Sequence, residues 1–358
     1  MIPTADQIRA IPGVIERVLA DGAAETARAA DGVTRARPRW AATLSRRGSA
    51  PVAVYTRYLL ATCLGIATGS SAPSVTTVYR APIDWRGGLL IAVSRTGEED
   101  DLASVVTEAR IGGAVTVAVT GDPSARLADA AEHALLCEVG TTDAATAYVA
   151  QLTAVAAFVA HARPSSPVGP SLVHLPDVLA RCVVPAERWV DSSGAVESAV
   201  NADRWSVLSR GYNLATALET AWLLSAVGRL PTTACSAADV AAADLGPEAR
   251  ILVFRPDGEM GRSVDEAIAR LTAHGSPPWV VGGFEAGTTP VDGHRRGERR
   301  TPLALPLDLP EVLTPPALVL PGALLAEGVA LARGIGPDHP VWPDVQRRSA
   351  AERGRRRS

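Results

Sequence analysis

The residue types best suited to chemistry lie in one short turn, Ser94-Arg95-Thr96-Gly97. Five apolar residues beginning at Leu89 precede this turn, and an acidic run from Glu98 to Asp101 follows it. The pattern predicts a buried strand, a tight turn and the start of a helix. Such a turn directs free backbone N–H groups and a helix dipole at one point, so it can hold an anion. A plain strand-to-helix connection with capping polar residues fits the pattern equally well.

The elements around this turn alternate between strand and helix. A first strand is expected at Trp40–Ser45, followed by a turn with Gly48 and Ser49 and then a helix. Further strands are expected near 75–79, at 89–93, at 114–120 and at 134–138, with a long helix at 141–162. This alternation predicts an α/β fold with a parallel, doubly wound sheet of five strands.

The same pattern recurs about 160 residues later, which indicates an internal duplication. The segment Trp40–Gly48 recurs as Trp205–Gly211, and Ser94–Glu98 recurs as Arg255–Glu259. We therefore expect two lobes, each a five-stranded parallel sheet flanked by helices. The expected division is a helical arm at 1–38, a first lobe at 39–162, a linker with helices at 163–203, a second lobe with a closing helix at 204–340, and a tail at 341–358 whose end is disordered.

The composition narrows the possible functions. The chain has 358 residues, 47% of them hydrophobic, and its net charge of −3 gives no reason to expect nucleic acid or a membrane surface as partner. With no apolar run near the roughly 20 residues of a membrane span and no signal-peptide pattern, we expect a cytoplasmic protein. All 35 basic residues are arginine, which excludes Schiff-base chemistry on a lysine and with it pyridoxal phosphate attachment. The six histidines and four cysteines are scattered, so we expect neither a metal site nor a cofactor.

The turn at Ser94 resembles the phosphate loop of sugar isomerase (SIS) domains, whose usual form is Ser-Gln-Ser-Gly-Glu/Arg-Thr/Ser. Nearly the whole chain is similar to the two-lobed isomerase module of glucosamine-6-phosphate synthase and its stand-alone relatives. The resemblance implies a phosphorylated sugar or amino-sugar as ligand. It implies a binding set at Gly48, Ser49, Ser94, Arg95, Thr96, Gly97, Glu99 and Thr142.

Glu99 departs from the family pattern, because a hydroxyl residue is usual there. A phosphate carries about −1.5 to −2 charge at pH 7 and would be repelled by this carboxylate. Arg95, or the arginines at 46 and 47, can offset the repulsion through a bidentate contact. Acidic residues in a first helical turn also complement the helix dipole, so the acidic run has a structural explanation as well.

The catalytic residues that the resemblance implies are largely missing. The family's proton-moving glutamate matches Ala226, its ring-opening histidine matches Leu245, and its lysine matches Asp344. Glu219 alone survives among the ionisable groups and is the candidate catalytic residue, with Glu99, Asp101 and His339 as further candidate proton carriers.

Three functions stay open. The first is an enzyme of the isomerase, aminotransferase or deglycase type that uses an altered acid–base set. The second is a catalytically degenerate module that binds or senses a phosphorylated sugar, and the third is a scaffolding partner without a small ligand. Alanine-rich helices with few charges, such as Ala144–Ala160, usually pack against something, and SIS modules commonly pair, so we expect a homodimer.

Overall fold

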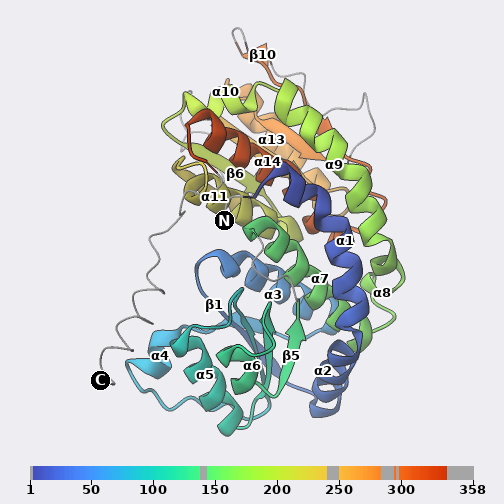
Figure 1. Cartoon of the computed structure of the whole chain (residues 1–358), viewed down its shortest axis with the longest axis vertical. Coiled ribbons are helices and arrows are strands. Elements are labelled where there is room, and N and C mark those ends of the chain that lie inside the picture. The colour runs from blue at the N-terminus through green and yellow to red at the C-terminus, as the bar shows by residue number, and fades with distance from the viewer. Residues whose placement is uncertain (1–2, 138–142, 240–249, 284–293, 296–297, 337–358) are drawn as a thin grey trace.

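The computed structural model describes residues 3–137, 143–239, 250–283, 294–295 and 298–336. Within them it contains two parallel sheets of five strands, each flanked by helices (Figure 1). The α/β fold predicted from the sequence is therefore confirmed. Thr142, Leu245, His339 and Asp344 lie outside the described residues, as does the predicted tail.

The first sheet has the order β2-β1-β3-β4-β5, with every neighbouring pair parallel. Its strands are β1 (Trp40–Ser45), β2 (Thr68–Ser70), β3 (Gly88–Val93), β4 (Val115–Thr120) and β5 (His133–Leu136). Its helices are α3 (Ala50–Leu64), α4 (Pro73–Thr77), α5 (Asp100–Ile111), α6 (Arg126–Ala130) and α7 (Ala144–Ala162). The strand expected near 75–79 is wrong, because helix α4 begins at Pro73 and the strand lies earlier, at β2.

The second sheet has the order β12-β9-β8-β6-β7, which repeats the connectivity of the first. Its strands are β6 (Trp205–Ser209), β7 (Thr232–Ser236), β8 (Arg250–Arg255), β9 (Trp279–Gly282) and β12 (Leu303–Ala304). Its helices are α11 (Leu214–Ala226), α13 (Gly261–Ala273) and α14 (Pro315–Ala332). A small hairpin, β10 (His294–Arg295) with β11 (Glu298–Arg299), precedes β12.

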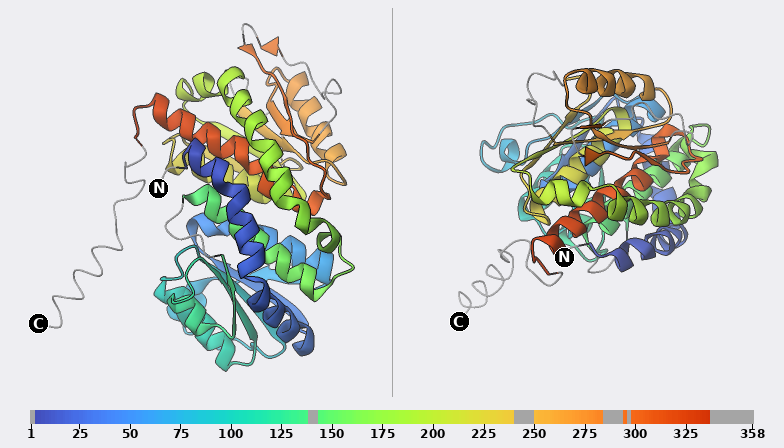
Figure 2. Two further views of the ribbon diagram at one scale, coloured as in Figure 1. Left: turned by 45° about the vertical axis from the view of Figure 1, so that its right-hand side comes forward. Right: turned by 90° about the horizontal axis from the view of Figure 1, so that it is seen from above.

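Helices outside the two sheets join them along one side. Helices α1 (Ala5–Asp21) and α9 (Leu175–Ser192) lie side by side there, and α9 also packs against α14 (Figures 1 and 2). Helix α2 (Ala23–Ala36) packs on α7, and the short helices α8 (Val168–Ser171) and α10 (Ala195–Val200) flank α9 in the chain. The arm and linker therefore connect the lobes rather than extending from them.

The core explains why the central strands are apolar along their whole length. In β3, Ile91 faces a large cluster shared by both lobes, whereas Leu90 faces a separate cluster under α5. In β8, Leu252 belongs to the shared cluster and Val253 packs under α13. Each sheet is thus covered on both faces, as parallel sheets generally are.

The two longest apolar helices belong to this core. Helix α7 and the segment Glu311–Ala332 are long and apolar enough to cross a membrane, but 89% and 78% of their apolar windows are buried inside the chain. Helix α7 packs against α1, α2, α3 and α14. The alanine-rich face that motivated the expected homodimer is therefore covered by the same chain, and the homodimer stays a prediction.

Candidate functional site

The candidate site lies where the strand order of the first sheet reverses, between β1 and β3. Ligands of open parallel sheets bind beyond the carboxyl ends of the strands at such a point. Ser45 is paired with Val93 at the ends of these strands, so the turns that follow them are neighbours. The structure therefore brings the turn with Gly48 and Ser49 beside the turn at Ser94, which we call the Ser94 turn (residues 94–99).

Gly97 fixes the shape of the Ser94 turn. Its φ is +70°, and a Cβ there would lie 2.5 Å from the Cβ of Ala125 and 2.8 Å from Oγ1 of Thr120. The Gly97 N–H donates to Oγ of Ser94 at 2.8 Å, and its carbonyl accepts from the N–H of Leu127 at 3.0 Å. The glycine expected from the sequence is thus required by both conformation and space.

The hydroxyl of Ser94 is hydrogen-bonded to the carboxylate of Glu99. The Ser94 Oγ donates to Oε2 of Glu99 at 2.5 Å, and Ser94 is 1% exposed. A serine hydroxyl carries one proton, so Ser94 has none left for another acceptor while this bond exists. Oγ1 of Thr96 is buried and has no hydrogen-bond partner among the described residues. The Ser94 turn therefore already holds a carboxylate, that of its own chain.

Arginines neutralise the acidic run around this turn. Arg46, from the neighbouring turn, pairs with Asp101. Arg126, at the start of α6, pairs with Asp100 and lies 3.7 Å from Glu98. The sequence pointed to Arg46 but not to Arg126, because only the tertiary structure brings α6 to the start of α5. The side chain of Arg47 lies outside the described residues.

A helix of the second lobe packs on the turn with Gly48 and Ser49. A Cβ on Gly48 would lie 3.2 Å from the indole of Trp222, so helix α11 covers the turn with Gly48 and Ser49. The reverse contact also exists, since the ring of Tyr58 on α3 lies 5.7 Å from that of Tyr212, in the corresponding turn of the second lobe. Each lobe therefore covers the first turn of the other, and both lobes shape the candidate site.

Glu219 lies at the contact between the lobes. Its side chain is 1% exposed, and Oε2 has no hydrogen-bond partner among the described residues. Burial raises the pKa of the Glu219 carboxyl well above its usual value; nearby Arg95 lowers this pKa, and Asp143 raises it. The buried Tyr148 hydroxyl also interacts electrostatically with Glu219. The environment favours the neutral acid, a group able to donate a proton.

Asp143 comes from the first lobe and caps helix α7. Its carboxylate accepts hydrogen bonds from the N–H of Thr146 at 2.9 Å and from the Thr146 hydroxyl at 2.6 Å. Asp143 is fully buried and is one of the groups that raise the pKa of the Glu219 carboxyl. The sequence did not single out Asp143 or Tyr148, because their proximity to Glu219 depends on how the lobes pack.

The other candidate catalytic residues that the structure describes are either paired with neighbouring groups or carry no ionisable group. Asp101 is paired with Arg46 and Glu99 is bonded to Ser94, so neither carboxylate is free in this state. Ala226 ends helix α11 and brings no ionisable group. Within the described residues, no group of three or more histidine, cysteine, aspartate or glutamate side chains is placed to hold a metal ion.

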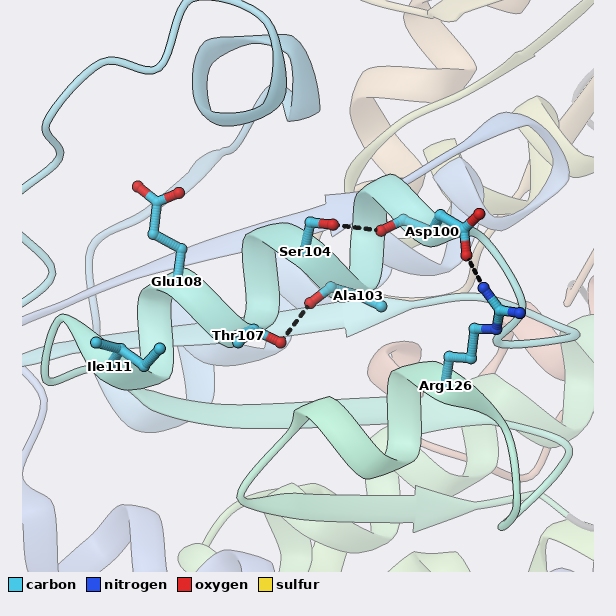
Figure 3. A pocket seen from close by; sticks show the side chains of 7 residues that line it. All are labelled: Asp100, Ala103, Ser104, Thr107, Glu108, Ile111 and Arg126. Atoms are coloured by element: carbon cyan, nitrogen blue, oxygen red, sulfur yellow. Dashed lines mark hydrogen bonds and ion pairs between the residues drawn. The ribbon is translucent and has the colours of Figure 1, made fainter.

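An open groove on the outer face of α5 is a weaker candidate (Figure 3). Its polar side chains bond to the chain itself: Ser104 donates to the carbonyl of Asp100 at 2.7 Å, and Thr107 donates to that of Ala103 at 2.9 Å. Arg126, at one end, is paired with Asp100. This groove does not gather free donors at one point, so the Ser94 turn is the better candidate site.

Part of the chain matches a known domain family. Residues 41–161, which include the Ser94 turn, match the SIS domain. No curated protein sequence matches the chain. Among solved structures, a candidate phosphosugar isomerase from Silicibacter pomeroyi DSS-3 is similar over 93% of this chain and 99% of its own, with a TM-score of 0.79 and 25% identity.

Two further structures share the fold. The C-terminal domain of glucosamine-fructose-6-phosphate aminotransferase from Francisella tularensis matches with a TM-score of 0.78 and 17% identity, over 94% of this chain and 96% of that domain. Tagatose-6-phosphate ketose/aldose isomerase from Escherichia coli matches with a TM-score of 0.73 and 16% identity, over 96% of this chain and 100% of its own. Residues 41–161 therefore match the SIS domain, and the chain shares its overall fold with these solved structures.

Proposed function

We propose that this chain binds a phosphorylated sugar or amino-sugar at two neighbouring turns, the Ser94 turn and the turn with Gly48 and Ser49. The observation that supports the proposal is the hydrogen bond from Ser94 to the Glu99 carboxylate, because in it a donor of this turn is bonded to an anionic group. The SIS match and the likeness to a candidate phosphosugar isomerase support phosphate as the ligand's anionic group.

The donors for such a phosphate are available on the Ser94 turn. The Ser94 hydroxyl can donate a hydrogen bond to the phosphate once Glu99 has moved away. The Thr96 hydroxyl has no hydrogen-bond partner among the described residues that it would have to give up. Arg95 lies in the turn itself, and Arg46, which is paired with Asp101, comes from the neighbouring turn; charge-assisted bonds from such groups to phosphate are the stronger class. The sugar portion then extends toward helix α11, which covers the neighbouring turn through Trp222.

A second candidate function is an enzyme with a rearranged acid–base set. Glu219 favours it, because a buried carboxylic acid with a raised pKa and an unused oxygen can act as a general acid. With no lysine in the chain, any chemistry on the sugar proceeds without a lysine Schiff base. The burial of Glu219 favours simple binding instead, since a substrate reaches this group only after the lobes move apart.

A thermal-shift screen tests binding. Hexose 6-phosphates and hexosamine 6-phosphates are expected to raise the melting temperature, and the same sugars without phosphate are expected to leave it unchanged. Equal effects from phosphorylated and plain sugars would refute the phosphate role of the Ser94 turn. No effect from any sugar phosphate at millimolar concentration would refute the proposed function.

Turnover is tested in deuterated water with fructose 6-phosphate and glucose 6-phosphate. We expect no deuterium at C1 or C2, because the positions that match the family's proton carriers are Ala226, Leu245 and Asp344. Loss of a general acid or base typically costs 10² to 10⁴-fold in rate. Incorporation at enzyme-like rates would show that Glu219 or another acid has taken over the proton transfer, and the chain would then be an isomerase.

A further inference from the structure

Because Ser94 is bonded to Glu99, a bound ligand at the Ser94 turn competes with a carboxylate of the chain itself. Ser94 is the most deeply buried donor of the turn, and its single proton is committed to Glu99. Glu99 is five residues from Ser94 in the chain, so its carboxylate is present at an effective concentration on the order of millimolar or more. A free anion must therefore bind more strongly than this competitor before it can accept a hydrogen bond from the Ser94 hydroxyl.

We propose that Glu99 sets the threshold for anion binding at the Ser94 turn: it stays bonded to Ser94 until an anion that makes more contacts than one carboxylate displaces it. This inference rests on the proposed function. A phosphate ester carries up to two charges and three terminal oxygens, so it accepts from Ser94 and Thr96 together. The carboxylate of a sugar acid only reproduces the bond that Glu99 already makes. With Glu99 as competitor, only the ligand that binds more strongly, the sugar phosphate, is expected to bind measurably.

The exchange does not require the helix to unfold. Glu99 precedes α5 as its cap residue, but its side chain makes no capping hydrogen bond. Asp100 and Asp101, which follow it, are held by Arg126 and Arg46. The start of α5 therefore stays in place while the half-buried Glu99 side chain turns toward solvent.

Glu98 provides a matched control for charge. It belongs to the same acidic run and lies 3.7 Å from Arg126, with about half of its side chain exposed. It makes no hydrogen bond to Ser94, whose proton goes to Glu99. Glu98→Gln therefore removes one negative charge near the Ser94 turn and leaves the competitor in place, whereas Glu99→Gln replaces the charged competitor by a neutral and weaker acceptor.

The experiment measures binding of glucosamine 6-phosphate, fructose 6-phosphate and glucuronate by calorimetry to wild type, Glu99→Gln and Glu98→Gln. Removing a charge-assisted competitor is expected to tighten sugar phosphate binding about tenfold or more in Glu99→Gln. Glucuronate binding is expected to become measurable only in that variant. Glu98→Gln is expected to stay within about threefold of wild type, since it loses only a screened surface charge.

Each other result decides against the inference. Equal tightening in the two variants would mean that Glu99 acts through charge alone, and weaker binding in Glu99→Gln would mean that Glu99 helps to hold the ligand. In both cases wild type still binds sugar phosphates, so the proposed function survives. If none of the three proteins binds either sugar phosphate, the proposed function fails together with this inference. If the glutamine of Glu99→Gln still accepts a hydrogen bond from Ser94, the test is repeated with Glu99→Ala, which leaves no acceptor at that position.

Discussion

Replacing Glu219 by glutamine is expected to stabilise the protein at neutral and alkaline pH. Glutamine keeps the shape of the neutral acid and carries no proton to lose. In the wild type, burial raises the pKa of the Glu219 carboxyl well above its usual 4.5, so the folded chain retains a proton that the unfolded chain releases. The unfolded state then binds fewer protons, and the free energy of unfolding falls as pH rises from about 4.5 toward the folded pKa.

The size of this effect has an upper bound. One pKa unit corresponds to about 1.36 kcal/mol, so a carboxyl that stays protonated in the fold loses at most about 4 kcal/mol between pH 4.5 and 7.5. Nearby Arg95 lowers the pKa and reduces this loss, while the adjacent Asp143 increases it. We expect Glu219→Gln to be more stable than wild type by a few kcal/mol or less at pH 7.5, and nearly equal to it near pH 4.5.

Urea unfolding at a series of pH values from 4.5 to 8.5 measures this difference. Other groups with raised pKa values, Glu311 and Glu327, contribute the same pH dependence to both proteins, so the difference isolates Glu219. Glu108→Gln on the exposed face of α5 is the control, and its curve should run parallel to wild type. A variant that loses stability at pH 8 would show that Glu219 is ionised and paired with Arg95, which would refute the reasoning.

Four shorter predictions concern the same regions. Thr96→Val should weaken sugar phosphate binding about ten- to a hundredfold in calorimetry, with little change in melting temperature; Thr107→Val in the α5 groove should change neither. Gly97→Ala should lower stability in urea unfolding, because the φ of +70° and the 2.5 Å approach to the Ala125 Cβ leave no room for a methyl group; an unchanged midpoint would contradict this. Tyr55→Phe removes the 2.8 Å bond from its hydroxyl to the Val312 carbonyl across the lobes and should cost about 1–3 kcal/mol; no measurable loss would mean that water replaces it. Light scattering at micromolar concentration should show a homodimer, and a pure monomer would refute that expectation.

The sequence by itself determined the features that depend on neighbouring residues. An apolar run followed by Ser-Arg-Thr-Gly and acidic residues specifies a buried strand, a turn and a helix start, because local conformation and two-sided burial leave few alternatives. The positive φ of Gly97 follows from the same local geometry. Short segments are harder to assign from the sequence. A strand is expected near 75–79, but helix α4 begins at Pro73, because a brief run of β-branched residues fits either element.

The tertiary structure alone decided the chemical state of the site. Glu99 could repel a phosphate or accept a bond from Ser94, and only the path of the chain around Gly97 brings its carboxylate to the hydroxyl. Glu219 lies beside Asp143 because two lobes far apart in sequence pack together, and this packing removes the water that would keep the carboxyl ionised. Periodicity specifies which face of a helix is buried, but long-range packing determines what that face meets.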